Sequence, residues 1–270
     1  MKFFKDLFQG IGNCFKGFSI LFEKGLWPYM FYPLLLWVLL WVASFYGIFL
    51  LADGISEWLK SYFQFESIPE TGHWLSFARP FLVSKVGFII GWVIKFLFWM
   101  VSGTFIKYVL LIILSPVFSL LSEKTEEKLT GANFPFNFFQ LLKDIGRGTL
   151  ISLRNMILEY FFIFICFIAC LFFPPLIFIT TPFLLLLGWY FIGFALLDYS
   201  CERHKMGIVE GIQFIKKNKG YAIGVGMVYS FFLMLPFIPG QVIGMMFGPA
   251  VAVVGSTLSF LAIKKEMQKP

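Results

Sequence analysis

Long apolar runs alternate with short polar, charged segments along this chain of 270 residues. The first run, 28–52, contains no charged residue. As a helix its 25 residues rise about 37 Å, more than the hydrocarbon core of about 30 Å. A second run, 81–121, is interrupted late by Pro116. We therefore predict two long transmembrane helices over 28–52 and 81–121.

Two later apolar segments are each broken near the middle by proline, which predicts helical hairpins over 150–197 and 221–263. A short polar helix, 137–148, is expected to precede the first hairpin. Pro174–Pro175 separates its two arms, and Pro236 with Pro239 divides the second hairpin.

The length of the second hairpin leaves its topology open. The run from Val225 to Leu235 is only about 16 Å long as a helix. The Gly248–Pro249 step is expected to break the run that follows. Pro-broken hairpins can be re-entrant where protein buries their bends, so half-spanning and fully spanning hairpins both fit.

Residues 1–24 predict an amphipathic helix that lies in the membrane interface. Aromatic and aliphatic residues recur at spacings of three and four, and lysines and amides fall between them. The apolar set is Phe4, Phe8, Ile11, Phe15, Phe18 and Phe22; the polar set is Lys5, Asp6, Gln9, Asn13 and Lys16.

Composition supports an all-α integral membrane protein, with residues 1–270 as a single membrane domain. The chain is 59% hydrophobic and only 14% charged, whereas soluble domains carry about 25% charged residues. A soluble globule is therefore excluded. No nucleotide-binding loop, dinucleotide fingerprint or metalloprotease motif occurs, so we expect no enzyme activity, catalytic residue, cofactor or metal.

The net charge of +7 reflects membrane topology rather than nucleic-acid binding. Seventeen of the 22 Lys and Arg residues lie in 1–27, 120–154, 198–220 and the C-terminal tail. The positive-inside rule then places both termini and both large connectors in the cytoplasm, which predicts a multi-pass membrane protein.

Three lysines lie inside the second predicted span: Lys85, Lys95 and Lys107. At 100° per residue they share a 120° arc of the helix. Lys85 and Lys107 can extend to opposite interfaces, but Lys95 lies near the middle of the membrane, where an unpaired cation is costly. Two interpretations remain open: an electropositive lining for an anion path, or a buried ion pair with Glu159.

The segment from Lys24 to Pro28 connects the interfacial helix to the first span. Gly25 ends one helix, and Pro28 fits the first turn of the next. The start of a helix presents unpaired N–H groups and a partial positive charge, which together can bind an oxyanion. Lys24, Gly25, Leu26 and Trp27 are therefore candidate anion-binding residues; a simple elbow between helices is the alternative.

Small residues spaced by four form a ridge in the last hairpin, which predicts close helix packing within or between protomers. Its members are Gly240, Gly244, Gly248, Ala252 and Ser256.

The sequence resembles the CysZ family of bacterial sulfate permeases, which shares its domain with the etoposide-induced-protein-like proteins. The likeness covers roughly residues 14–262 and rests on the order and spacing of short motifs. They are Lys16-Gly17-Phe18, Gly25-Leu26, Pro33, Leu114-Ser115-Pro116, Leu121-Ser122-Glu123, Asp198-Tyr199, Glu202-Arg203, Lys219-Gly220, Gly224, Pro249-Ala250-Val251-Ala252 and Gly255-Ser256-Thr257.

This resemblance implies two long spanning helices with re-entrant hairpins, a homo-oligomer, and passive sulfate uptake that supplies cysteine synthesis. It also implies that sulfate binds near a Gly-Leu-Arg element at the start of the first span. Gly25 and Leu26 match that element, but Trp27 replaces its arginine.

Two functions from different classes follow. The first is an oligomeric permease or channel of the bacterial inner membrane for sulfate or a related oxyanion, passive or ion-coupled. In it, Lys95 and Lys107 attract the anion along the path, and the amides around Gly25 and Leu26 form an entry site. The second is a membrane scaffold with the same fold that transports nothing, which Trp27 favours.

Overall fold

The computed structural model describes residues 2–40, 42–43, 45–47, 54, 105–134 and 138–268. Every regular element in these residues is a helix, which confirms the all-α class. The chain divides into two compact units, Met1–Trp37 with Tyr108–Pro270, and Val38–Lys107. The labelled elements belong to the first unit: α1 (Lys2–Glu23), η1 (Trp27–Met30), α5 (Ser115–Thr130), α6 (Phe138–Phe172), η5 (Pro174–Leu176), α7 (Ile177–Arg203), α8 (Ile208–Lys217), α9 (Lys219–Leu233) and α10 (Phe237–Met267).

Four of the described helices are long and apolar enough to cross a membrane, and a bent pair would make a fifth. The first predicted span corresponds to the helix Trp27–Gly47. Of the second, residues 81–104 lie outside the described residues. Its remainder bends by 60° between Phe105–Ile113 and α5. Pro116 lies in the first turn of α5, where its missing N–H suits the start of a new helix.

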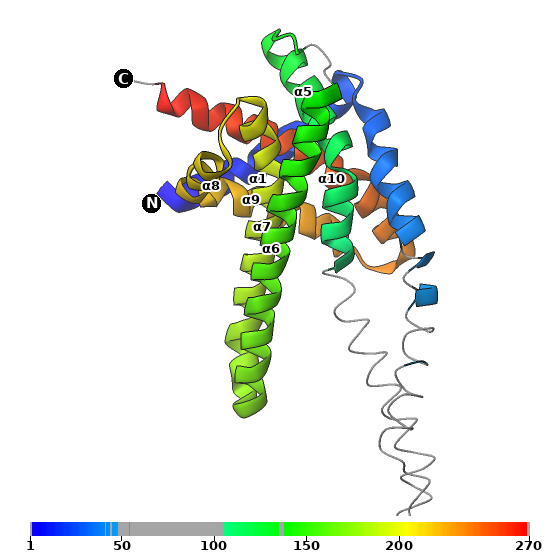
Figure 1. Ribbon diagram of the computed structural model, residues 1–270, viewed down its shortest axis with the longest axis vertical. Helices are drawn as coiled ribbons and strands as arrows, with labels where there is room; N and C mark the ends of the chain where they lie inside the picture. Colours follow the sequence, from blue (N-terminus) through cyan, green and yellow to red (C-terminus); the bar gives the residue numbers. More distant parts are fainter. Residues whose placement is uncertain are drawn as a thin grey trace, which may run out of the picture. The chain divides into compact units, whose positions relative to one another are not determined.

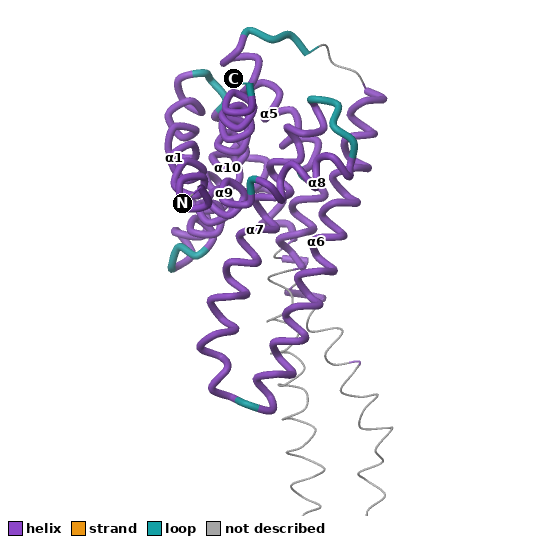
Figure 2. The backbone as a smooth tube through the Cα atoms, turned by 90° about the vertical axis from the view of Figure 1, so that its left-hand side faces the viewer, coloured by secondary structure: helices purple, strands orange, loops and turns teal. Residues whose placement is uncertain are grey.

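Helices α6 and α7 form the first predicted hairpin and lie side by side along their length (Figure 1). The expected separate helix at 137–148 is instead the first part of a continuous α6 of 35 residues. Figure 2 shows the closed end of this hairpin extending beyond α1, α8, α9 and α10. There the exposed surface is aromatic: Phe172 is 84% and Phe178 82% exposed.

The turn of this hairpin satisfies its own backbone donors. Pro174 and Pro175 have no N–H group, and the N–H groups of Phe173 and Leu176 donate to Ala169 and Phe173 carbonyls, each at 3.0 Å. The N–H of Ile177 donates to the Pro174 and Pro175 carbonyls. An apolar tip without unpaired donors is compatible with a hydrocarbon environment, where an unmade backbone hydrogen bond is costly.

The second hairpin, α9 and α10, is largely enclosed by protein. The most apolar stretch of α10 is 72% buried, against 17% for those of α6 and α7. The 15 residues of α9 rise only about 22 Å, less than the thickness of the hydrocarbon core. Contrary to the expected break at Gly248–Pro249, α10 continues through Pro249. Its packing against four other helices offsets a cost of about 3 kcal/mol for an internal proline.

Helix α1 packs against α9 and α10 through small residues and leaves its phenylalanines outside. The buried positions are Asp6, Gly10, Cys14, Gly17 and Leu21. Burial raises the pKa of the Cys14 thiol to about 12, so it is protonated at neutral pH. The exposed phenylalanine face is the one that an interfacial helix presents to lipid.

Glycine allows three of these helices to touch backbone to backbone. A Cβ atom at Gly10 of α1 would lie 2.9 Å from the Tyr221 carbonyl oxygen of α9. A Cβ atom at Gly193 of α7 would overlap the Ala222 carbonyl on another side of α9. The predicted ridge also packs within the protomer, since Gly244 and Gly248 contact Phe232 of α9.

Two glycines of α1 form a matched pair for testing this packing. We expect Gly10→Ala to lower the free energy of unfolding by about 1–3 kcal/mol, because the new methyl group overpacks the contact with α9. Gly12 has no atom within 4 Å of its Cβ position. Gly12→Ala should therefore stabilise the helix by about 0.5–1 kcal/mol. Thermal unfolding in detergent measures the stability of both variants. Equal changes in stability would contradict the close contact of Gly10 with α9.

Candidate functional site

Helix α1 ends in a Schellman motif at the predicted anion-binding element. Gly25 has a φ of 70°, a left-handed conformation that favours glycine. Its N–H donates to the Phe22 carbonyl at 3.2 Å, and the Leu26 N–H donates to the Leu21 carbonyl at 2.9 Å. Leu21 and Leu26 are both buried, which is the apolar contact that accompanies this motif.

The structure keeps the four residues Lys24–Trp27 together at the junction between α1 and η1. Lys24 and Gly25 are exposed, and Trp27 is 50% exposed with its ring edge-on to Phe31. The N–H groups of Gly25 and Leu26 are engaged in closing α1. An oxyanion at this element would therefore be held chiefly by Lys24 and by the start of η1, and its binding there stays a prediction.

The predicted intramembrane charges are only partly within the described residues. Lys95 lies outside them, so both interpretations of it, the lining of an anion path and the ion pair with Glu159, stay open. Lys107 is half-buried and directly precedes Tyr108. The Tyr108 hydroxyl donates to Glu159 Oε2 at 2.5 Å. Glu159 of α6 is buried.

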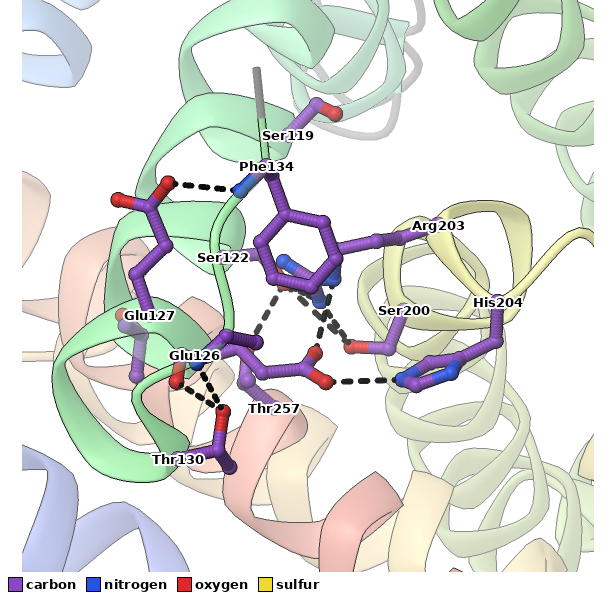
Figure 3. A network of polar contacts seen from close by, with 12 residues as sticks. Ser119, Ser122, Glu126, Glu127, Thr130, Phe134, Ser200, Arg203, His204 and Thr257 are labelled. Atoms are coloured by element: carbon purple, nitrogen blue, oxygen red, sulfur yellow. Dashed lines mark hydrogen bonds and ion pairs between the residues drawn. The ribbon is translucent and has the colours of Figure 1, made fainter.

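A set of charged residues, which we call the α5–α7–α10 cluster, lies where these three helices meet (Figure 3). Glu126 of α5 lies between two partners from the end of α7: its Oε2 is 2.9 Å from Arg203 Nε, and its Oε1 is 2.9 Å from His204 Nε2. Lys264 Nζ of α10 donates to His204 Nδ1 at 3.1 Å, which leaves the imidazole proton on Nε2, facing Glu126.

Hydroxyl groups complete this cluster. Arg203 Nη2 donates to Ser122 Oγ at 2.7 Å and to Ser200 Oγ at 3.1 Å. Ser122 also shares a hydrogen bond of 2.7 Å with Thr257 of α10. The Phe134 ring covers the guanidinium at 5.6 Å, as Figure 3 shows. The cluster thus joins two cations, a carboxylate, an imidazole and three hydroxyls from three helices.

A second buried ion pair joins α6 to α7. Arg147 Nε and Nη2 donate to Asp198 Oδ2 and Oδ1 at 2.9 and 2.7 Å, a bidentate arrangement. The two side chains are only 9% and 2% exposed. Arg147 Nη1 donates to the Met206 carbonyl, which attaches the segment after α7 to the same guanidinium.

The sequence places Asp198, Glu202 and Arg203 close together at the end of an apolar run, but it does not show which residues on other helices pair with them. Asp198 pairs with α6, and Arg203 pairs with α5. Polar residues inside the apolar run of α10, such as Thr257, indicate a polar contact with another helix, because a buried hydroxyl requires a hydrogen-bond partner. Among the described residues, no group of three or more His, Cys, Asp and Glu side chains could hold a metal ion.

Removing one member of a buried ion pair leaves the other without compensation. We expect Arg147→Met to lower the free energy of unfolding by about 3–5 kcal/mol, because Asp198 keeps its charge in a buried site. Lys143→Met, at an exposed position one turn earlier on α6, is the control. Unfolding in detergent is the measurement. Equal stability of the two variants would show that the pair contributes nothing.

Comparison with known proteins identifies the family. Residues 13–239 match the family described as Sulfate transporter CysZ/Etoposide-induced protein 2.4. The chain is 26% identical over 246 residues to "Sulfate transporter CysZ" of Pseudomonas fluorescens (strain Pf0-1), covering 90% of this chain and 89% of that protein.

Two further relatives carry the same name. That of Pseudomonas aeruginosa (strain LESB58) is 26% identical over 257 residues, 94% of either chain. That of Pectobacterium atrosepticum is 25% identical over 234 residues, which cover 85% of this chain and 78% of the relative. The expected resemblance is confirmed: the chain belongs to the Sulfate transporter CysZ/Etoposide-induced protein 2.4 family.

Proposed function

We propose that this protein transports sulfate across a bacterial membrane. The observation that carries the proposal is the family match over residues 13–239, joined by relatives over most of the chain that are named sulfate transporters. Several helices long and apolar enough to span support a multi-pass membrane protein. Transport of this kind makes the protein a carrier or channel and not an enzyme.

The finer features of the proposal are passive or ion-coupled flux, a role in sulfur assimilation, and assembly as a homo-oligomer in the inner membrane. The distribution of Lys and Arg supports cytoplasmic termini. The two ends of the described chain lie on one side of the first unit, where Lys5 of α1 pairs with Glu266 of α10 at 3.2 Å (Figure 1).

The proposed anion path uses the lysines of the second span and the element Lys24–Trp27. A dianion in hydrocarbon needs compensating charge, and Lys95 and Lys107 are two of the three lysines that the sequence places inside the second predicted span. Lys24, together with the start of η1, offers a site at the membrane face. Related oxyanions share the charge and the acceptor oxygens of sulfate and would use the same donors.

Radiolabelled sulfate flux into proteoliposomes tests this function. We expect the wild-type protein to carry sulfate faster than empty vesicles do. Lys95→Ala should lower the flux by about tenfold or more, because a focused positive charge raises the local anion concentration. Lys107→Ala should lower it as well. Lys216→Ala, which removes an exposed lysine of α8, is the control and should leave the flux unchanged.

A transport-free membrane scaffold is the second candidate, and Trp27 is the observation that favours it. The resemblance implies an arginine at this position, and the indole ring offers a single N–H donor without charge. Wild-type flux equal to that of empty vesicles would support the scaffold.

Substitutions of Trp27 test whether sulfate binds at the element Lys24–Trp27. We expect Trp27→Arg to lower the sulfate concentration at half-maximal flux by about tenfold, the effect of one added charge-assisted hydrogen bond. Trp27→Gln keeps a polar side chain without the charge and should not reproduce the gain. If arginine and glutamine have the same effect, sulfate does not bind at this element.

A further inference from the structure

Arg154 lies near the start of the apolar part of α6, and its charge has no acidic partner among the described residues. Its guanidinium makes one described hydrogen bond, in which Nη1 donates to Asn155 Oδ1 at 3.2 Å. Arg147, by contrast, pairs with Asp198, and Arg203 pairs with Glu126. Of the arginines that the structure describes, Arg154 is therefore the one whose charge no carboxylate neutralises.

The acids that flank Arg154 on the α6–α7 hairpin are directed elsewhere. Glu159 follows five residues later on α6, so its side chain leaves the helix about 140° away from that of Arg154. Its carboxylate accepts from the Tyr108 hydroxyl. On α7, both oxygens of Asp198 accept from Arg147. Neither acid is placed to compensate Arg154.

Contacts with α7 fix the position of the guanidinium. Its Cζ lies 5.5 Å from the centroid of the Phe194 ring, which is fully buried. Asn155 is also fully buried, and its Nδ2 donates to the Phe191 carbonyl at 3.4 Å, which directs Oδ1 toward Arg154. A guanidinium has five N–H donors in a planar fork. Four of them have no acceptor in the part of the chain that the structure describes, although the group itself is held in place.

The depth of Arg154 makes an uncompensated charge costly but accessible. It lies seven residues beyond Arg147, about 10 Å further along α6. Another 18 residues separate it from Phe172 at the tip of the hairpin, a rise of about 27 Å. A cation at the start of such an apolar arm is tolerated where it meets water or a counter-ion. Arg154 is half-buried, so part of its fork is open to a ligand.

We propose that Arg154 is the centre of an oxyanion-binding site at the interface of α6 and α7, where one tetrahedral oxyanion binds the open edge of the guanidinium. Two parallel N–H groups match two oxygens of such an anion, and these bonds are about twice as strong as those between neutral groups. Free sulfate and the phosphodiester of a membrane lipid share this chemistry. That the occupant is transported sulfate rests on the proposed function; the oxyanion site itself does not.

Binding of radiolabelled sulfate to the purified protein in detergent tests the site without transport. We expect Arg154→Gln to weaken binding at least about tenfold, the effect of losing a charge-assisted hydrogen bond. Arg154→Lys keeps the charge without the fork and should have an intermediate affinity. Lys143→Gln is the control, because it removes the same charge from an exposed position of α6 and should leave binding unchanged. Selenate should compete with sulfate, and chloride at equal ionic strength should not.

Mass spectrometry of the protein with its retained lipids tests the second source of the oxyanion. If lipid phosphate occupies the site, Arg154→Gln should retain about tenfold less phosphatidylglycerol than the wild-type protein, and added phosphatidylglycerol should displace sulfate. If free sulfate occupies it, only sulfate binding depends on Arg154. Either result supports the oxyanion site. Sulfate affinity and lipid retention that are both unchanged in Arg154→Gln overturn it, and Arg154→Lys is the second variant should Arg154→Gln fold poorly.

Sulfate flux into proteoliposomes relates the site to transport. If the bound anion is transported sulfate, Arg154→Gln should lower the flux about tenfold at sulfate concentrations well below saturation, in line with the loss of affinity. Unchanged flux with lost binding overturns the link to transport and leaves the oxyanion site in place. A wild-type protein that carries no sulfate contradicts the proposed function, and the two binding measurements then decide the site alone.

Discussion

The close approach of α9 to its neighbours is the constraint on which the first unit depends. Lipid does not drive helices together as water does, so association relies on tight packing and on polar contacts. At Gly10 the backbone of α1 contacts Tyr221 of α9, and at Gly193 the backbone of α7 contacts Ala222 on another side of α9. Gly244 of α10 contacts Phe232, near the C-terminal end of α9. Helix α9 is too short to cross the membrane by itself, yet four other helices of the unit are arranged around it.

The buried charges restrict this arrangement further, because each ion pair joins different helices. Arg147 with Asp198 joins α6 to α7, and Glu126 with Arg203 joins α5 to α7. Apolar side chains tolerate small shifts in helix register, whereas a bidentate guanidinium does not. All of these groups lie near the ends of α7 and α10 that the Lys and Arg distribution places toward the cytoplasm. The remainder of the α6–α7 hairpin is thereby left almost free of charge, as a lipid environment requires.

The hydrophobic pattern was sufficient to predict the helical class, because the length and apolar character of a run are local properties. The interfacial position of α1 and the depth of the two hairpins stay predictions. The pattern did not predict the continuity of α6 or of α10 through Pro249, since tertiary packing compensates for local breakers. Gly25 was correctly assigned to the end of α1, but the use of its N–H in a Schellman motif depends on backbone geometry. The α5–α7–α10 cluster could not be assembled from sequence, because Glu126, Arg203 and Lys264 are far apart along the chain.

The turn at Pro174–Pro175 has a consequence for how the protein adapts to its bilayer. With two prolines and three engaged N–H groups, the tip has no donor that must reach water. Its outer surface is aromatic and aliphatic, and no Lys or Arg occurs between Arg154 and Arg203 to anchor it at an interface. The depth of the tip is therefore free to vary with membrane thickness, and mismatch costs only fractions of a kcal/mol per ångström. Bilayers of different thickness should change the tilt of this hairpin, while the charged ends of α6 and α7 remain at the same depth relative to the membrane surface.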